Sequence, residues 1–190
     1  MDKDVSAGSA STTTLGQLAL GITLLAFGIG STGVIDGVTA ADAVMLALYV
    51  GGITLFVTGL LEFRAGNAFA GTAFAGLGAF WFTWGTGAGT PSSGDAAGLF
   101  LLLWALFALS LTLGAAGSGP LAQGMYGLLF LGLLLMGVGQ LADSDVLGEA
   151  GGWVAAVAGL AAWYGATAAL ANWPTAVPRR AAGRGVTAAG

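Results

Sequence analysis

Residues 44–61 read VMLALYVGGITLFVTGLL and contain no charged side chain. An α-helix rises about 1.5 Å per residue, so about 20 apolar residues match the thickness of a bilayer's hydrocarbon core. There are six such charge-free stretches in the chain, at residues 15–34, 44–61, 66–87, 96–116, 121–141 and 151–173. Because every backbone N–H and C=O in lipid must be satisfied within the protein, each stretch is predicted to be a helix.

The composition also argues against a soluble globular domain. Of the 190 residues, 56% are hydrophobic and 7% are charged, whereas a soluble domain has about 25% charged residues. The 35 glycines are typical of membrane helices, in which glycine lets neighbouring backbones approach closely. We therefore expect an all-α integral membrane protein, with a tail at 1–14, a six-helix membrane domain at 15–173 and a basic disordered tail at 174–190.

The charged residues predict the orientation of the chain. With six spans, all five basic residues fall on one side of the membrane, and six of the nine acidic residues fall on the other. Cytoplasmic loops carry an excess of Lys and Arg, which places the basic side and both termini in the cytoplasm. The expected location is the inner (plasma) membrane, which the chain crosses several times.

The missing residue types exclude several functions. The chain has neither cysteine nor histidine, which excludes disulfides, Cys/His metal sites and histidine bases. Its net charge of −4 argues against a nucleic-acid partner. The spans contain no nucleophile–base pair and no phosphate-binding Gly-Lys-Ser/Thr loop. We predict a protein that is not an enzyme and that holds no cofactor and no metal.

The loop between the second and third stretches holds the most informative polar residues. It lies within GLLEFRAGNAF, residues 59–69, where Glu62 and Arg64 are expected at the membrane interface. Asn67 is placed to cap the following helix. This segment is either a well-capped turn or a site where the exposed N–H groups of a helix N-terminus bind an anion.

Other polar side chains within the spans mark a candidate solute path. Each has an alternative role in packing or in bonding its own backbone. With Glu62 and Asn67, the candidates for the substrate path or the anion site are Gln17, Thr72 and Gln140.

The same segment also carries a family resemblance. The matching residues are Gly51-Gly52 and the runs GLLEF (59–63), GNAF (66–69), TAF (72–74) and GAFW (78–81). With them the chain resembles the acetate uptake transporters, the YaaH-like succinate–acetate permeases. The resemblance implies a homo-hexamer of six-helix protomers with one pore each. It further implies passage of small monocarboxylates such as acetate, sometimes with succinate, by a proton-linked or channel-like route.

In this family the pore narrows at a Phe, a Tyr and a Leu. Ungapped matching places these positions at Leu20, Leu77 and Leu129. A ring of three leucines gates by dewetting, and it favours a protonated acid or a partly hydrated anion over a bare carboxylate. The missing phenol hydroxyl leaves open an alternative, a channel for small neutral solutes such as ammonia or water. A non-transporting scaffold is disfavoured, because the basic tail is too short to fold as a domain.

Overall fold

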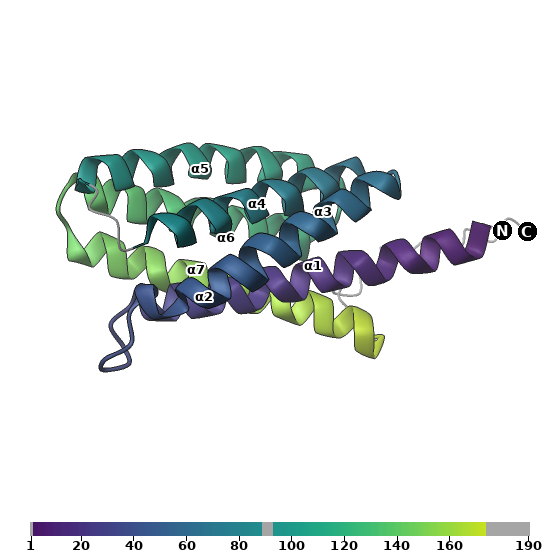
Figure 1. Cartoon of the computed structure of the whole chain (residues 1–190), viewed down its shortest axis with the longest axis horizontal. Coiled ribbons are helices and arrows are strands. Elements are labelled where there is room, and N and C mark those ends of the chain that lie inside the picture. The colour runs from purple at the N-terminus through teal and green to yellow at the C-terminus, as the bar shows by residue number, and fades with distance from the viewer. Residues whose placement is uncertain (1, 89–92, 174–190) are drawn as a thin grey trace, which may run out of the picture.

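The computed structural model describes residues 2–88 and 93–173, with side chains from residue 12 onward. The predicted disordered tail at 174–190 lies outside these residues. All regular secondary structure in the described part of the chain is helical (Figure 1). In chain order the elements are α1 (Asp2–Gly30), a 3-10 turn (Ala40–Ala43), α2 (Val44–Leu46), a π-helical stretch (Ala47–Thr54), α3 (Leu55–Arg64), α4 (Ala68–Gly87), α5 (Gly94–Gly114), a 3-10 turn (Ala115–Gly117), α6 (Pro120–Leu141) and α7 (Asp145–Ala171).

Each predicted stretch falls on one helical segment. The second stretch is built from α2, the π-helical stretch and α3, which follow one another without a break. Within the described residues, five segments are long and apolar enough to cross a membrane. The 20-residue α4 is not among them, because its many glycine, threonine and tryptophan residues lower its mean hydropathy. The chain is therefore an all-α integral membrane protein.

The N-terminal segment differs in one respect from the expected tail at 1–14. Helix α1 begins at Asp2 and continues through this segment into the first predicted stretch. It ends at Gly30, four residues before the predicted end of that stretch. The cytoplasmic placement of the segment stays a prediction.

The helix starts follow local capping chemistry. The Asn67 side chain accepts a hydrogen bond from the Ala70 N–H and so caps α4, as predicted. Ser93 caps α5 in the same way. Pro120 occupies the first turn of α6, where its missing N–H has no intrahelical partner to lose.

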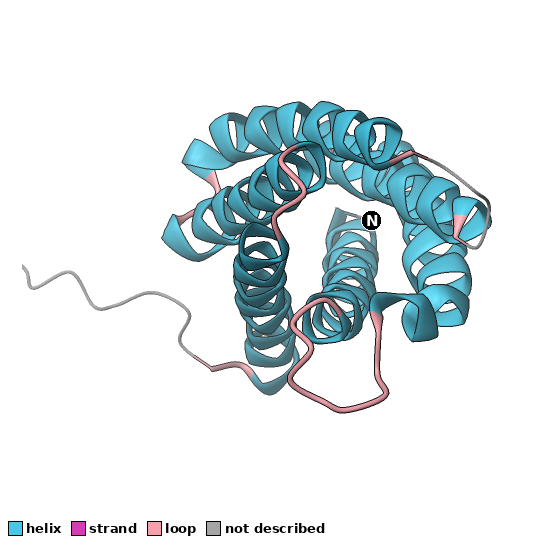
Figure 2. Cartoon of the chain, turned by 90° about the vertical axis from the view of Figure 1, so that its left-hand side faces the viewer, coloured by secondary structure: helices cyan, strands magenta, loops and turns pink. Residues whose placement is uncertain are grey.

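The helices lie side by side in a bundle whose end-on view is ring-like (Figure 2). Helix α7 packs along both α1 and α6, α5 packs along α6, and α3 packs along α4. Glycine makes the α1–α7 contact possible, as the composition predicted. An added Cβ on Gly28 would lie 2.5 Å from the Ala156 nitrogen, and one on Gly159 would lie 2.7 Å from the Leu25 nitrogen.

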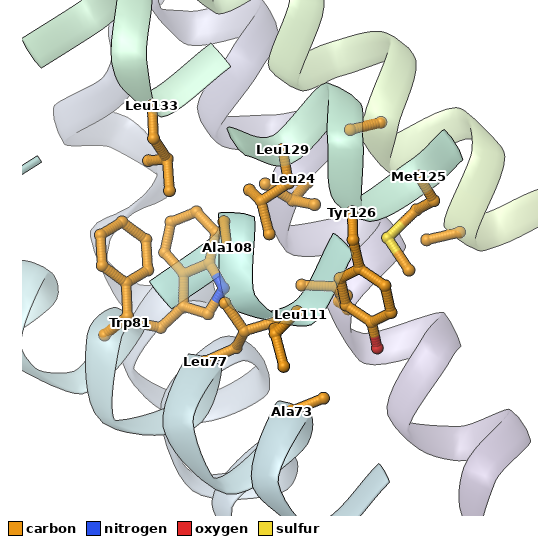
Figure 3. Packing of buried hydrophobic residues seen from close by; sticks show 14 of the residues in the cluster. Leu24, Ala73, Leu77, Trp81, Ala108, Leu111, Met125, Tyr126, Leu129 and Leu133 are labelled. Atoms are coloured by element: carbon orange, nitrogen blue, oxygen red, sulfur yellow. The ribbon is translucent and has the colours of Figure 1, made fainter. Parts of the chain in front are cut away.

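Aromatic side chains join α4 to α5, whose backbones make fewer close approaches. The Phe80 ring stacks on Phe100, with centroids 5.6 Å apart, and meets Trp104 edge-on at 5.3 Å. These side chains border one continuous apolar cluster in the interior, which draws residues from every long helix (Figure 3).

Candidate functional site

Two cavities lie at opposite ends of the bundle. One has a volume of about 900 Å³ and is lined by residues from the C-terminal ends of α1, α4 and α6 and the N-terminal ends of α5 and α7. Gln140 lines it, and we call it the Gln140 cavity. The other has a volume of about 640 Å³ and is lined by Gln17, the start of α6 and the end of α7. We call it the Gln17 cavity. Among the described residues, the two cavities share no lining residue.

Of the three leucines predicted to form a constriction, Leu20 and Leu129 lie along their helices between residues that line the two cavities. Leu20, Leu77 and Leu129 are each at most 1% exposed and belong to the same interior cluster. Along α1, Leu20 falls between Gln17, which lines one cavity, and Phe27, which lines the other. Leu129 is bracketed on α6 in the same manner by Met125 and Met136. We call these three leucines the first layer, and their role as a pore constriction stays a prediction.

A second layer lies one helical turn closer to the Gln140 cavity. Its members are Leu24, Trp81 and Leu133, each four residues after a member of the first layer and each at most 2% exposed. Figure 3 shows all three among the buried side chains, together with Leu77 and Leu129. Residues four apart share a helix face, so this spacing was a signal from which the sequence could have predicted the second layer.

A constriction built from these two layers would disfavour ions. Five of the six side chains are leucine, which offers neither a charge nor a hydrogen-bonding group. Moving a carboxylate or an ammonium ion between them without a partner is expensive, because the ion loses its hydration. A small neutral solute loses less hydration free energy than an ion does. A constriction formed by these layers would therefore act as a filter against charge.

The predicted polar residues do not form a single site. Gln17 and Gln140 line different cavities, so they lie on opposite sides of the two layers. Thr72 lies on the exposed face of α4, and its hydroxyl donates a 2.8 Å hydrogen bond to the Ala68 carbonyl. A role for Thr72 in the solute path stays a prediction. Its observed hydrogen bond goes to the backbone of its own helix, which is the alternative role considered above.

Glu62 is buried within the bundle in the last turn of α3, and its expected place at the membrane interface stays a prediction. The side chain is 0% exposed. The Thr13 hydroxyl of α1 donates to its Oε1 over 2.8 Å, and the Asn67 amide donates to its Oε2 over 2.8 Å. Burial of the carboxylate depends on these donors, one of which comes from a distant part of the chain. Arg64, two residues later, is exposed.

Thr13, Glu62 and Asn67 thus tie α1 to the α3–α4 hairpin, and we call them the hairpin clamp. Both ends of the Asn67 amide are used, since its oxygen caps α4 and its nitrogen donates to Glu62. A carboxylate already lies beside the α4 N-terminus. Binding of a solute anion there stays a prediction, and the negative Glu62 would work against it.

Comparison with known proteins points to one family. The model of the GPR1/FUN34/yaaH family matches residues 3–177. The "Succinate-acetate/proton symporter SatP" of Escherichia coli (strain K12) is 29% identical over 167 residues, which are 83% of this chain and 87% of that protein. The "Ammonia transport outward protein 2" of Saccharomyces cerevisiae is 28% identical over 150 residues, but this chain spans only 53% of its length.

A solved structure agrees with this result. The "Structure of the bacterial acetate channel SatP" superposes with a TM-score of 0.78 at 25% sequence identity. The superposition covers 85% of this chain and 92% of that one. The bundle of this chain is therefore shared along nearly its whole length.

Proposed function

This chain belongs to the GPR1/FUN34/yaaH family, and we propose that it carries small monocarboxylates, acetate above all, across the membrane through each protomer. One observation supports this proposal more than any other. Two cavities at opposite ends of the bundle are separated by two layers of buried side chains, and the three leucines matched to the family constriction form one of these layers. The names of the bacterial relatives, an acetate channel and a succinate-acetate/proton symporter, support the choice of substrate.

We propose that the solute crosses the layers as the neutral acid, so that transport is linked to protons. Asp143, Asp145 and Glu149 line the Gln140 cavity. These carboxylates repel an approaching anion and favour its protonated form. Neither layer contains an ionisable side chain, so the proton travels on the solute and the layers need not titrate. The same route would carry succinate only with both of its carboxyl groups protonated, which makes succinate a poorer substrate.

The proposal includes a specific topology and assembly. We place six spans in the inner (plasma) membrane, with both termini in the cytoplasm, because only an even count keeps all five basic residues on one side. Although α4 is not among the five segments long and apolar enough to cross a membrane, it packs along α3 within the bundle and so need not be apolar enough to face lipid. Exposed leucines on α5, such as Leu103 at 58% exposure, suit contact with lipid or with neighbouring protomers of a homo-hexamer.

Uptake of radiolabelled acetate into liposomes tests this proposal. We expect uptake faster than in empty liposomes, and faster still when the outside is acidic. Leu129→Ala removes part of the first layer and is expected to increase uptake. Leu103→Ala makes the same change on the exposed face of α5 and is expected to leave uptake unchanged. Uptake no faster than in empty liposomes, at both acidic and neutral pH, would refute the proposal.

A channel for ammonia is the second candidate. The all-leucine first layer, which lacks a phenol hydroxyl, favours a small neutral solute, and one fungal relative carries an ammonia-transport name. Stopped-flow measurement of ammonia and acetate permeability on the same liposomes separates the two functions. An ammonia permeability above that of empty liposomes, with no acetate permeability, would establish the second candidate over the first.

A further inference from the structure

The indole nitrogen of Trp81 is buried without a hydrogen-bond partner. Trp81 is 0% exposed, and its Nε1 has no partner among the described residues. Buried threonines in the same bundle do find acceptors, as Thr23 does at the Ala19 carbonyl, 2.8 Å away. A buried donor left unpaired destabilises the folded state, so most are paired and an exception indicates a specific role.

This unpaired donor lies in the second layer between the two cavities. Leu77 is one turn away on the same face of α4, and Leu24 and Leu133 are the other members of the layer. Figure 3 shows the Trp81 nitrogen turned into the cluster of buried side chains rather than away from it. Among the six side chains of the two layers, this N–H is the one group that can form a conventional hydrogen bond with a solute.

Close packing fixes the direction in which the N–H points. Phe27 meets the indole edge-on, with centroids 5.2 Å apart and planes at 76°, and Phe80 meets it at 4.8 Å and 65°. Gly51 lies against the ring, so closely that an added Cβ would be 2.7 Å from the indole Cγ. Gly51 belongs to the π-helical stretch, a rare element that is frequent at functional sites. The indole is therefore held in place before any solute arrives.

We propose that the Trp81 N–H donates a hydrogen bond to an oxygen of the permeating carboxylic acid as the solute passes between the two layers. This inference rests on the proposed transport function. An indole N–H donates and does not accept, so it suits carbonyl, carboxylate and water oxygens. Ammonium offers only N–H groups and gains no hydrogen bond there. Trp81 thus lowers the barrier for an oxygen-bearing solute without admitting this cation.

The test compares Trp81→Phe with Trp104→Phe in the full-length chain. Both variants replace an indole by a phenyl ring, but Trp104 contacts Phe80 and Phe107 on the α5 side of the aromatic cluster. Loss of the hydrogen bond at Trp81 is expected to slow acetate uptake roughly tenfold or more. Ammonium, which cannot accept this bond, should permeate wild type and Trp81→Phe equally poorly, and Trp104→Phe should transport acetate like the wild type.

Spectroscopy supplies a measurement that does not depend on the variant folding. The full-length chain is labelled with ¹⁵N at tryptophan and measured by nuclear magnetic resonance. The Trp81 indole signal is assigned by linking it to the backbone amide signal of the same residue. Added acetate at acidic pH should shift this signal saturably, while the Trp104 signal stays in place. A wild type that transports acetate would overturn the inference if Trp81→Phe kept full uptake or if the Trp81 signal did not respond. If the wild type moves no acetate, the proposed function fails, and a Trp81 signal that is also unresponsive overturns the inference as well.

Discussion

Gly159→Ala offers a direct test of the close contact between α1 and α7. In the structure, a Cβ added to Gly159 would lie 2.7 Å from the Leu25 nitrogen, 2.9 Å from the Gly21 oxygen and 3.0 Å from the Leu24 Cβ. Two of these three atoms belong to the α1 backbone and cannot rotate away. Ordinary contacts between such atoms begin at about 3.5 Å, so the two helices must separate by about 1 Å to admit the methyl group.

The expected loss of stability follows from this displacement. Overpacking that moves backbone costs about 1–3 kcal/mol, while replacing glycine by alanine within a helix contributes up to about 1 kcal/mol in favour of folding. Gly148 lies on the same helix, and nothing lies within 4 Å of its added Cβ. Gly148→Ala therefore gains the helix preference of alanine without any overpacking. The difference in unfolding free energy between the two variants is therefore expected to be about 1–3 kcal/mol.

Unfolding by SDS in mixed detergent micelles, followed by circular dichroism, measures this difference. Gly148→Ala should be as stable as the wild type or slightly more stable, and Gly159→Ala should be less stable than Gly148→Ala. Equal unfolding free energies, within about 0.5 kcal/mol, would show that α1 and α7 are not held as closely as the structure has them.

Two further variants test the hairpin clamp and the second layer. Glu62→Ala removes the acceptors of two hydrogen bonds and leaves the half-buried Asn67 nitrogen without this partner, so it should lower the unfolding free energy by about 1–3 kcal/mol. Glu62→Gln retains one acceptor oxygen and should lose less unfolding free energy than Glu62→Ala. If SDS unfolds Glu62→Gln more easily than Glu62→Ala, the hairpin clamp is ruled out. Leu133→Ala should increase acetate and water permeability of liposomes, because it opens the second layer. Leu131→Ala makes the same change at a side chain of α6 that is 40% exposed, and an equal increase there would contradict a barrier at Leu133.

The positions of the helices were predictable from the sequence because lipid leaves the backbone few options. A long charge-free stretch in a membrane must satisfy its own N–H and C=O groups, and each of the six predicted stretches is helical. The Asn67 cap was predictable as well, since capping depends only on neighbours in the sequence. Ungapped matching to the family supplied Leu20, Leu77 and Leu129, which are all buried, and their role as a constriction stays a prediction.

Glu62 could not be placed from its local sequence. A carboxylate near a helix end usually reaches water, and nothing in the neighbouring residues indicates that Glu62 is buried. Its burial depends on Thr13, which is 49 residues away in the chain and comes into reach only when α1 packs beside the hairpin. Pairing of a buried charge is thus a property of the assembled bundle, and a single sequence carries little record of it.

The unpaired Trp81 nitrogen is harder still to predict, because it depends on what its neighbours lack. A tryptophan in a membrane helix normally places its N–H near a carbonyl or at the wet interface. Here Phe27, Phe80, Trp84 and Gly51 pack against the indole, and none of their side chains accepts a conventional hydrogen bond. The same shortage of polar side chains that would disfavour ions in the two layers also leaves this donor available. A layer that rejects charge and still offers one hydrogen bond to an oxygen is well suited to pass a small carboxylic acid in its neutral form.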